Sequence, residues 1–275
     1  MARHLAADAA RLRFRLERRF ALRDLALQLE GAERPFVVAL PADPDAPLDE
    51  LAAQQAARRA AGDVHEMARA ATGAEPEADE QAAVVARATV ASGAHLPYWA
   101  LLWPSGLALA EALLAEPAIV RGARALELGC GLGVTAAVAL SLGARLTVSD
   151  LFDDALLFAE YNALRCAATA PTSLLLNWRT AAGRARLLRA APFDLLLAAD
   201  VLYEQEDVAP LLELIPALLR PGAPFWLAEP GRKASRAFVE AALERGWRDR
   251  SSVSERAWPP DDDVTRVIVH RFTLP

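Results

Sequence analysis

The sequence predicts an α/β protein built on a doubly wound, Rossmann-like sheet of seven strands with an antiparallel last strand. Three observations support this. Short apolar runs alternate with helix-length segments from residue 121 onward, the first run ends in a glycine-rich turn, and no helix separates the last two runs. Strands that alternate with helices imply right-handed crossovers between parallel strands. Two successive strands at the chain end favour an antiparallel final strand.

The apolar runs define the expected strands, and the segments between them define the expected helices. We expect strands at residues 123–128, 144–149, 172–176, 193–199, 223–228, 247–253 and 264–272. We expect helices at residues 134–142, 153–165, 208–219 and 235–244. Asp153 or Asp154 is suited to cap the second helix, because a carboxylate accepts hydrogen bonds from the free amides of a helix N-terminus.

The chain divides near residue 90 into a small N-terminal α+β extension, residues 1–90, and a main domain, residues 91–275. Within the extension, Leu12, Phe14 and Leu16 alternate with charged residues, which predicts a strand. The other elements expected in the extension are strands at residues 25–29 and 36–40, a loop at 41–47, a helix at 49–71 and a linker at 72–79. The sequence indicates no catalytic group in this region.

Composition excludes several classes of protein. With 54% hydrophobic residues the chain can bury a core, and its net charge of −6 argues against a nucleic-acid partner. Residues 95–115 are the most apolar stretch, but Pro97 and Pro104 break it, so we expect no membrane span. Cys130 and Cys166 are too few for a disulfide framework or a zinc site, and we expect reduced thiols in a cytoplasmic protein without a metal.

The glycine-rich turn follows the first strand of the main domain. Ligands of open α/β sheets bind at the carboxyl ends of the strands, where this turn lies. Gly129, Gly131 and Gly133 have the spacing G-x-G-x-G, whereas a dinucleotide fingerprint needs its third glycine at position 134, which is Val134. A tight turn with close backbone approach suits the amino-acid end of S-adenosylmethionine (SAM). The spacing therefore favours SAM over NAD(P).

Polar residues at the ends of neighbouring strands suit the other parts of SAM. The Glu127 carboxylate can pair with the ammonium of the methionine moiety. Asp150, about 20 residues beyond the loop, can accept hydrogen bonds from the ribose hydroxyls. Asn177 can pair with the adenine amino group while Trp178 packs on the base. The alternatives are a helix cap for Asp150 and core packing for Trp178.

Four segments together resemble family 16 of the seven-β-strand methyltransferases, which includes protein-lysine methyltransferases and proteins similar to nicotinamide N-methyltransferase. The resemblance rests on residues 97–106, 126–133, 177–178 and 200–203, and it covers roughly residues 95 to 275. Residues 98–106 and 228–232 look closest to the branch that methylates lysines of the electron-transfer flavoprotein β-subunit. The resemblance does not extend to the first 90 residues.

The resemblance implies a role for each matching residue. It places Trp103, Ser105 and Gly106 over the SAM pocket, Glu127, Gly129 and Gly131 at the methionine part, Asp150 at the ribose, and Asn177 and Trp178 at the adenine. Asp200 and Tyr203 match the family's D-x-x-Y motif beside the methyl-accepting nitrogen. Asp200, which also borders the cofactor, would orient the amine, and Tyr203 would shape the pocket. Position 177 is commonly Asp in related proteins, but the Asn oxygen also accepts a hydrogen bond.

The expected function is SAM-dependent N-methylation of a lysine in a protein substrate. Methylation of a small heteroaromatic or amine nitrogen is the alternative within the same class. An NAD(P)-dependent oxidoreductase and a non-catalytic module with the SAM fold are the alternatives from other classes. The sequence leaves the acceptor, the oligomeric state and the role of residues 1–90 open.

Overall fold

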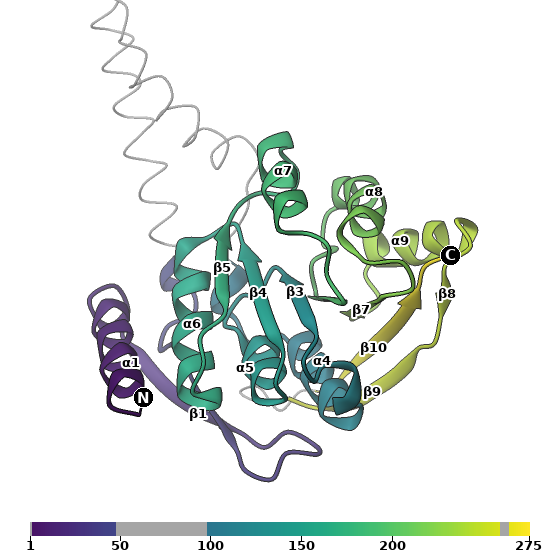
Figure 1. The fold of residues 1–275 in the computed structure, drawn as a ribbon. Coiled ribbons are helices and arrows are strands. Elements are labelled where there is room, and N and C mark those ends of the chain that lie inside the picture. Colours follow the sequence, from purple (N-terminus) through teal and green to yellow (C-terminus); the bar gives the residue numbers. More distant parts are fainter. Residues whose placement is uncertain (1, 48–97, 259–263) are drawn as a thin grey trace, which may run out of the picture.

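The computed structural model describes residues 2–47, 98–258 and 264–275 (Figure 1). These residues form an open, mostly parallel sheet with helices on both faces, and a separate N-terminal hairpin packs on one side of it. The predicted fold class is confirmed. The predicted helix at residues 49–71 and the predicted linker at 72–79 lie outside the described residues.

Five parallel strands form the main part of the sheet, in the order β5-β4-β3-β6-β7. Their bounds are β3 Arg124–Leu128, β4 Arg145–Asp150, β5 Thr172–Leu175, β6 Leu195–Ala199 and β7 Pro224–Glu229. The chain adds β4 and β5 on one side of β3, and β6 and β7 on the other, so the strand order switches at β3 and β6. Loops diverge at such a switch and leave a crevice at the carboxyl ends of the strands.

The far side of the sheet is antiparallel, as predicted. The last strand, β10 (Val264–Thr273), pairs antiparallel with β7 on one side and with two short strands, β8 (Arg248–Asp249) and β9 (Ser252–Ala257), on the other. The seventh position of the expected sheet is therefore split between two strands, which makes eight in this sheet. The predicted strand at residues 247–253 is interrupted after Asp249, and the part that resumes continues beyond residue 253.

Helices cover both faces of the sheet, and the alternation of side chains along the strands matches this arrangement. The helices α4 (Pro104–Ala115), α5 (Val134–Ser141) and α6 (Asp153–Ala167) cover one face, and α7 (Ala181–Ala190), α8 (Val208–Leu218) and α9 (Lys233–Glu244) the other (Figure 1). Within β6, Leu195 and Leu197 join the core of the first face, while Leu196 and Ala198 join the second. Burial on both faces explains why β6 is apolar along its whole length.

Helix α7 was not predicted. Its start carries a recognisable signal, because the hydroxyl of Thr180 accepts a hydrogen bond from the Gly183 amide at 3.0 Å. A further difference concerns α6, whose N-cap is Phe152 with no side-chain cap. The predicted cap role of Asp153 or Asp154 is wrong, since both lie in the first turn and form ion pairs with Arg19.

The N-terminal extension begins with helix α1 (Ala2–Glu17), followed by the antiparallel strands β1 (Leu22–Leu27) and β2 (Phe36–Pro41). The predicted strand through Leu12, Phe14 and Leu16 is wrong. In a strand these three side chains would share a face, but Leu12 and Leu16 are buried while Phe14 is 62% exposed. Residues four apart share a face of a helix, and this burial follows that rule.

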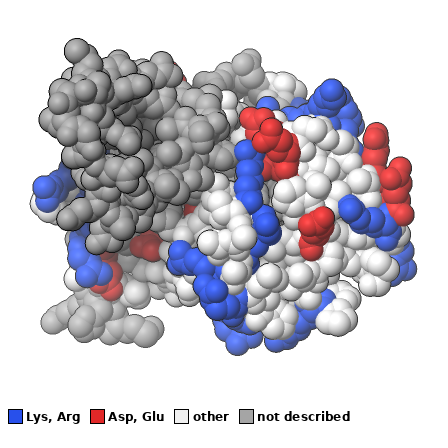
Figure 2. Space-filling model, turned by 90° about the horizontal axis from the view of Figure 1, so that it is seen from above, with Lys and Arg blue, Asp and Glu red and all other residues white. Residues whose placement is uncertain are grey.

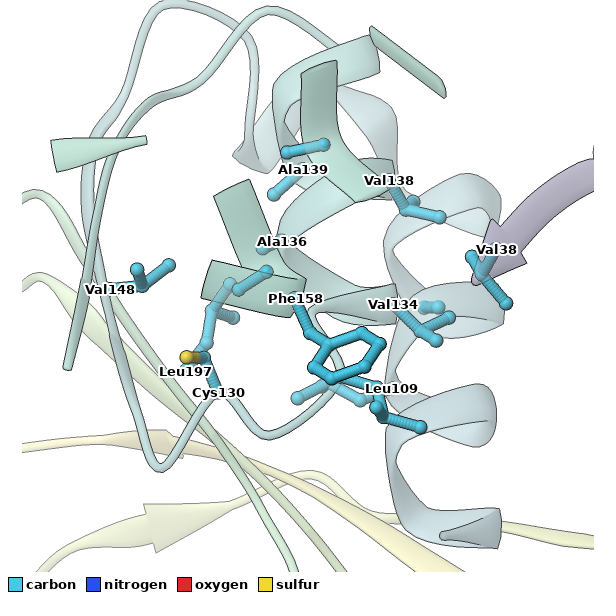
Figure 3. Close-up of a cluster of buried hydrophobic side chains, with 14 of the residues drawn as sticks. Val38, Leu109, Cys130, Val134, Ala136, Val138, Ala139, Val148, Phe158 and Leu197 are labelled. Atoms are coloured by element: carbon cyan, nitrogen blue, oxygen red, sulfur yellow. The ribbon is translucent and has the colours of Figure 1, made fainter. Parts of the chain in front are cut away.

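The extension packs directly against the main domain. Figure 3 shows Val38 of β2 beside Val134 and Phe158, within the same hydrophobic cluster as the helices of the first face. The buried side chain of Asn162 on α6 accepts from the Ala39 amide at 2.7 Å and donates to the Ala39 carbonyl at 2.9 Å. The strand β2 is thereby tied to α6. The predicted domain boundary near residue 90 lies outside the described residues.

The visible surface mixes charges of both signs. In Figure 2, blue and red groups lie among uncharged side chains, and no single sign covers the face that is drawn. None of the helices in residues 2–47, 98–258 and 264–275 combines the length and apolar character needed to cross a bilayer.

Candidate functional site

The glycine turn connects β3 to α5 at the switch in strand order. Gly133 has a φ of +76°, and a Cβ there would lie 2.5 Å from the Cα of Ala159 on α6. At Gly129, with a φ of +66°, a Cβ would lie 2.8 Å from Val201 Cγ1. Positive φ and close packing both demand glycine, so the turn brings its backbone against α6 and the loop after β6. Asn162 also holds the turn, since its amide donates to the Leu132 carbonyl at 2.9 Å.

Asp150 ends β4 and clamps the same turn. Its Oδ2 accepts from the Gly131 amide at 3.0 Å, and its Oδ1 accepts from the Phe152 amide at 3.1 Å. The carboxyl group is buried, and burial raises the pKa of Asp150 to about 6 despite the opposing effect of the backbone amides. Asp150 thus joins the loop after β3 to the start of α6, which places an acid where a ribose-binding group was predicted.

Glu127 is buried in the middle of the sheet beside the glycine turn. It is 2% exposed, and its Oε2 has no hydrogen-bond partner among the described residues. Burial raises the pKa of Glu127 to about 8, with the nearby Asp150 charge acting in the same direction and the neighbouring Thr135 opposing it. An unpaired buried carboxylate is costly unless a cation or donor meets it. The site is therefore suited to a ligand that carries a positive charge.

Two adjoining hollows flank the turn. The first, of about 50 Å³, contains Glu127, Thr135, Gly106 and the glycine loop. The second, of about 90 Å³, is lined by Asp150, Trp178, Asp200, Tyr203 and neighbouring residues. Both hollows are lined by Trp103, Gly129, Gly131 and Ala199. The predicted methionine end and the predicted ribose and acceptor ends therefore lie on two sides of one loop.

Asp200 lies directly after β6 and has the strained φ of +53°. Its side chain is 7% exposed and makes a bidentate pair with Arg232, from Nε to Oδ1 at 2.7 Å and from Nη2 to Oδ2 at 3.1 Å. The Arg232 guanidinium also lies 5.6 Å from the centre of the Trp103 ring. Sequence reasoning missed Arg232 as a functional residue, although residues 228–232 contributed to the family resemblance.

Aromatic side chains border the Asp200 pair. Tyr98, in the 3₁₀ turn η1 (Tyr98–Ala100), lies edge-on to Trp103 at 6.0 Å and to Tyr203 at 5.7 Å between ring centres. The Trp103 indole donates to the Tyr98 carbonyl at 2.7 Å. Tyr203 is 36% exposed, yet partial burial raises its pKa to about 12, so it stays a neutral phenol at physiological pH. These rings form an aromatic rim beside the Asp200 carboxylate.

Two predicted cofactor residues lie apart from the hollows. Ser105 is buried on α4 and does not line either hollow, and its hydroxyl has no partner in the part of the chain that the structure describes. Asn177 also lines neither hollow, and its Oδ1 accepts from the Arg179 amide at 2.8 Å. Trp178 does line the second hollow, and it also packs against the core of the second face. The adenine role of Asn177 stays a prediction.

Thr135 and Tyr98 are further residues of the site that sequence reasoning did not select. The Thr135 hydroxyl donates to the Gly106 carbonyl at 3.1 Å, which ties the start of α4 to the start of α5 beside Glu127. Thr135 follows the glycine turn by two residues, and this position was the available signal. Tyr98 was quoted only as part of the resemblance.

The chain is similar to several known proteins. The model of a family described as lysine methyltransferase matches residues 98–244, which is more than half of the chain. The electron transfer flavoprotein beta subunit lysine methyltransferase of Xenopus laevis is 33% identical over 137 residues, covering 50% of this chain and 53% of that protein. The protein of the same name from Mus musculus is 35% identical over 123 residues, covering 43% of this chain and 44% of that protein.

The chain spans about half the length of the curated relatives it matches. Among solved structures, magnesium protoporphyrin IX methyltransferase from Synechocystis PCC 6803 with bound SAM has a TM-score of 0.48. It is 15% identical, covering 61% of this chain and 77% of that chain.

Proposed function

Because the chain belongs to the lysine methyltransferase family, we propose that it transfers the methyl group of SAM to the side-chain nitrogen of a lysine in a protein. SAM is the cofactor that this family uses, as the sequence predicted. The observation that carries the proposal is the pair of hollows sharing one glycine loop, with an unpaired acid, Glu127, in one and Asp150 with Asp200 in the other.

The residues present fit SAM at three points. The free Oε2 of Glu127 suits the ammonium of the methionine moiety, and the backbone of the glycine loop permits close approach. Asp150, held by two backbone amides, retains lone pairs for the ribose hydroxyls. Trp178 offers an apolar face in the same hollow. SAM would supply a methyl group already activated by a sulfonium, so the protein has mainly to orient the acceptor and exclude water.

The acceptor end is formed by Asp200, Tyr203, Tyr98 and Trp103. A lysine has an ordinary pKa of about 10.4 and must be neutral to attack a methyl group. The aromatic rim surrounds its alkyl chain, and Asp200 accepts a hydrogen bond from its nitrogen. Tyr203 keeps its proton because its pKa is raised to about 12, so its role is to shape the pocket and not to act as a base.

The substrate we propose is the β-subunit of an electron transfer flavoprotein. Several relatives are named for methylation of that subunit, and the family match over residues 98–244 contains the residues that line both hollows. Neither a nucleic acid nor a membrane is required by the proposal. A cytoplasmic location is part of it, since Cys130 and Cys166 are both free.

The proposal is tested by incubating the protein with methyl-labelled SAM and purified electron transfer flavoprotein from the same organism. We expect label on a lysine of the β-subunit, located by mass spectrometry of its peptides. A parallel incubation with cell lysate is divided into protein, nucleic-acid and small-molecule fractions. Label in the small-molecule fraction alone would contradict a protein substrate and favour a heteroaromatic or amine acceptor.

A further inference from the structure

Arg232 lies in the loop between β7 and α9, and this loop is held by a buried polar network. Glu229 Oε2 accepts from the Gly231 amide at 2.5 Å and from the Ser235 hydroxyl, which also lies 2.9 Å from the Arg232 carbonyl. His270 in turn lies 3.4 Å from Glu229, with its other ring nitrogen 2.7 Å from Asp249. The backbone at Arg232 is therefore anchored on β7 and β10, independently of any ligand.

From this anchored loop, the guanidinium reaches both oxygens of Asp200. The fork of two bonds, at 2.7 and 3.1 Å, uses one lone-pair direction of each oxygen. A carboxylate has about four acceptor sites, so Asp200 retains acceptor capacity toward the second hollow that it lines. The Asp200–Arg232 pair has no net charge, although its carboxylate oxygens still accept hydrogen bonds.

The charge of this pair matters for the acceptor. A lone carboxylate beside an amine favours its ammonium form, since an opposite charge within 4–6 Å stabilises the charged state. An ammonium has no lone pair for attack on a methyl group. A carboxylate already matched by a guanidinium holds the N–H of the amine while favouring its protonation much less.

We propose that Arg232 is a positioning residue for methyl transfer, which fixes Asp200 and offsets its charge so that Asp200 orients a neutral amine. This inference rests on the proposed function, because it assigns Arg232 a role at the same acceptor. Arg232 acts through Asp200 and contacts the Trp103 ring, and no contact with the reacting atoms is needed.

Other titratable groups face this pair, and they remain unchanged when Arg232 is replaced. Glu229 and Tyr98 interact electrostatically with Arg232, and Asp150, Glu204, Asp207 and Arg179 interact with Tyr203 across the hollow. Asp207 and Arg179 form a bidentate pair of their own, at 2.6 and 2.8 Å. Replacement of Arg232 therefore changes the guanidinium that, among the described residues, contacts Asp200.

The experiment compares the pH dependence of kcat for the wild-type protein and for Arg232→Met, at saturating SAM and with the flavoprotein β-subunit as acceptor. Arg232→Met keeps an unbranched side chain up to the position of the guanidinium but removes its charge, which leaves the Asp200 charge unmatched. We expect the acid limb of the profile to move up by about one pH unit, which is roughly a tenfold loss at neutral pH that disappears in alkaline buffer. Arg232→Lys, which keeps the charge, should shift the limb by less than half as much.

Arg245→Met is the matched control, because Arg245 is an exposed arginine at the opposite end of α9. It should leave the profile unchanged. A loss of kcat by the same factor at every pH in Arg232→Met would show a purely structural role and overturn the inference. Arg232→Gln provides a second uncharged variant if the methionine variant does not fold.

A second measurement separates this inference from the proposed function. Butylamine is titrated by calorimetry into the protein loaded with S-adenosylhomocysteine, at a series of pH values. Affinity should fall as the pH drops below the pKa of the amine, and it should fall further in the wild type than in Arg232→Met, because the lone Asp200 of the variant also binds the ammonium. The pH at which the affinity levels off should be lower in the wild type by about one unit. If this shift is found but no lysine is methylated, the proposed function fails alone. If lysine is methylated and neither measurement shifts, the role of Arg232 fails alone.

Discussion

Glu127 and Asp200 are two acids at the same edge of the sheet that differ in their partners. Glu127, on β3, is buried with an oxygen that has no partner among the described residues, and its pKa is raised to about 8. Asp200, after the neighbouring strand β6, has both oxygens bound by Arg232. The two hollows that contain these acids share the glycine loop as a common wall.

The difference shows how one sheet edge can serve two kinds of ligand. An unpaired acid gains most from a ligand that brings a positive charge with it, as the ammonium of SAM does. An acid paired within the protein offers hydrogen bonds without a strong preference for a charged ligand. The first arrangement suits a cofactor, and the second suits an amine that must be neutral to react.

Removing the paired acid should have the largest effect. In Asp200→Ala, the acceptor loses its hydrogen-bond partner and Arg232 is left unmatched, so we expect kcat/KM for methyl transfer to fall on the order of 100-fold. Initial rates with labelled SAM measure this loss, and calorimetry should show SAM affinity little changed. Asp200→Asn keeps a residue that tolerates a positive φ and one acceptor oxygen, and should lose less. Equal activity of Asp200→Ala and the wild-type protein would show that Asp200 has no role in methyl transfer.

Replacing the unpaired acid, Glu127, should weaken the binding of SAM and leave the rate of methyl transfer largely unchanged. For Glu127→Gln we expect SAM affinity to fall roughly 10- to 100-fold, because a charge-assisted hydrogen bond is lost. Once SAM is saturating, kcat should change much less. Wild-type binding should also release a proton near neutral pH, since the pKa of about 8 must fall when the ammonium arrives. Calorimetry in buffers of different ionisation enthalpy detects this release, and its persistence in Glu127→Gln would assign it to another group.

The unpaired acid should also make the stability of the SAM-free protein depend on pH. The pKa of Glu127 is raised from 4.5 to about 8, so the folded state binds its proton more tightly than the unfolded chain does. This contribution to stability is complete below pH 4.5 and is lost as the pH rises to about 8. The free energy of unfolding should fall by up to about 1.4 kcal/mol per pH unit in this window. Urea unfolding of Glu127→Gln should show a smaller slope, whereas equal slopes would contradict the assignment.

The smallest effect is expected at Tyr203. Its hydroxyl is a neutral donor at the rim, and a single hydrogen bond contributes about 0.5–1.5 kcal/mol. We therefore expect Tyr203→Phe to lower kcat/KM by roughly 2- to 10-fold with no change in the pH profile of the rate. A displaced profile would mean that the phenol exchanges a proton during turnover, contrary to its raised pKa.

Much of the fold followed from local patterns in the sequence. The apolar runs of the five parallel strands and the glycine spacing at 129, 131 and 133 predicted the sheet, its antiparallel last strand and the place of the site. The error at Leu12, Phe14 and Leu16 arose because a short run that alternates in polarity can also be part of a helix. The burial of Leu12 and Leu16 in the core, where α1 packs against α6, distinguishes the helix from the strand.

By itself, the sequence determined which strand ends carry acids, because a residue that follows an apolar run in an α/β chain reaches the carboxyl edge of the sheet. Asp150 and Asp200 were found in this way, and Glu127 was selected because it stands just before the glycine turn. Only the tertiary structure decided the partner of each acid. Arg232 follows Asp200 by 32 residues, and the two meet because β7 lies beside β6 and the Glu229 network directs the next loop inward. Spacing along the chain predicts local geometry, whereas the charge state of a buried site depends on contacts between loops that only the assembled sheet brings together.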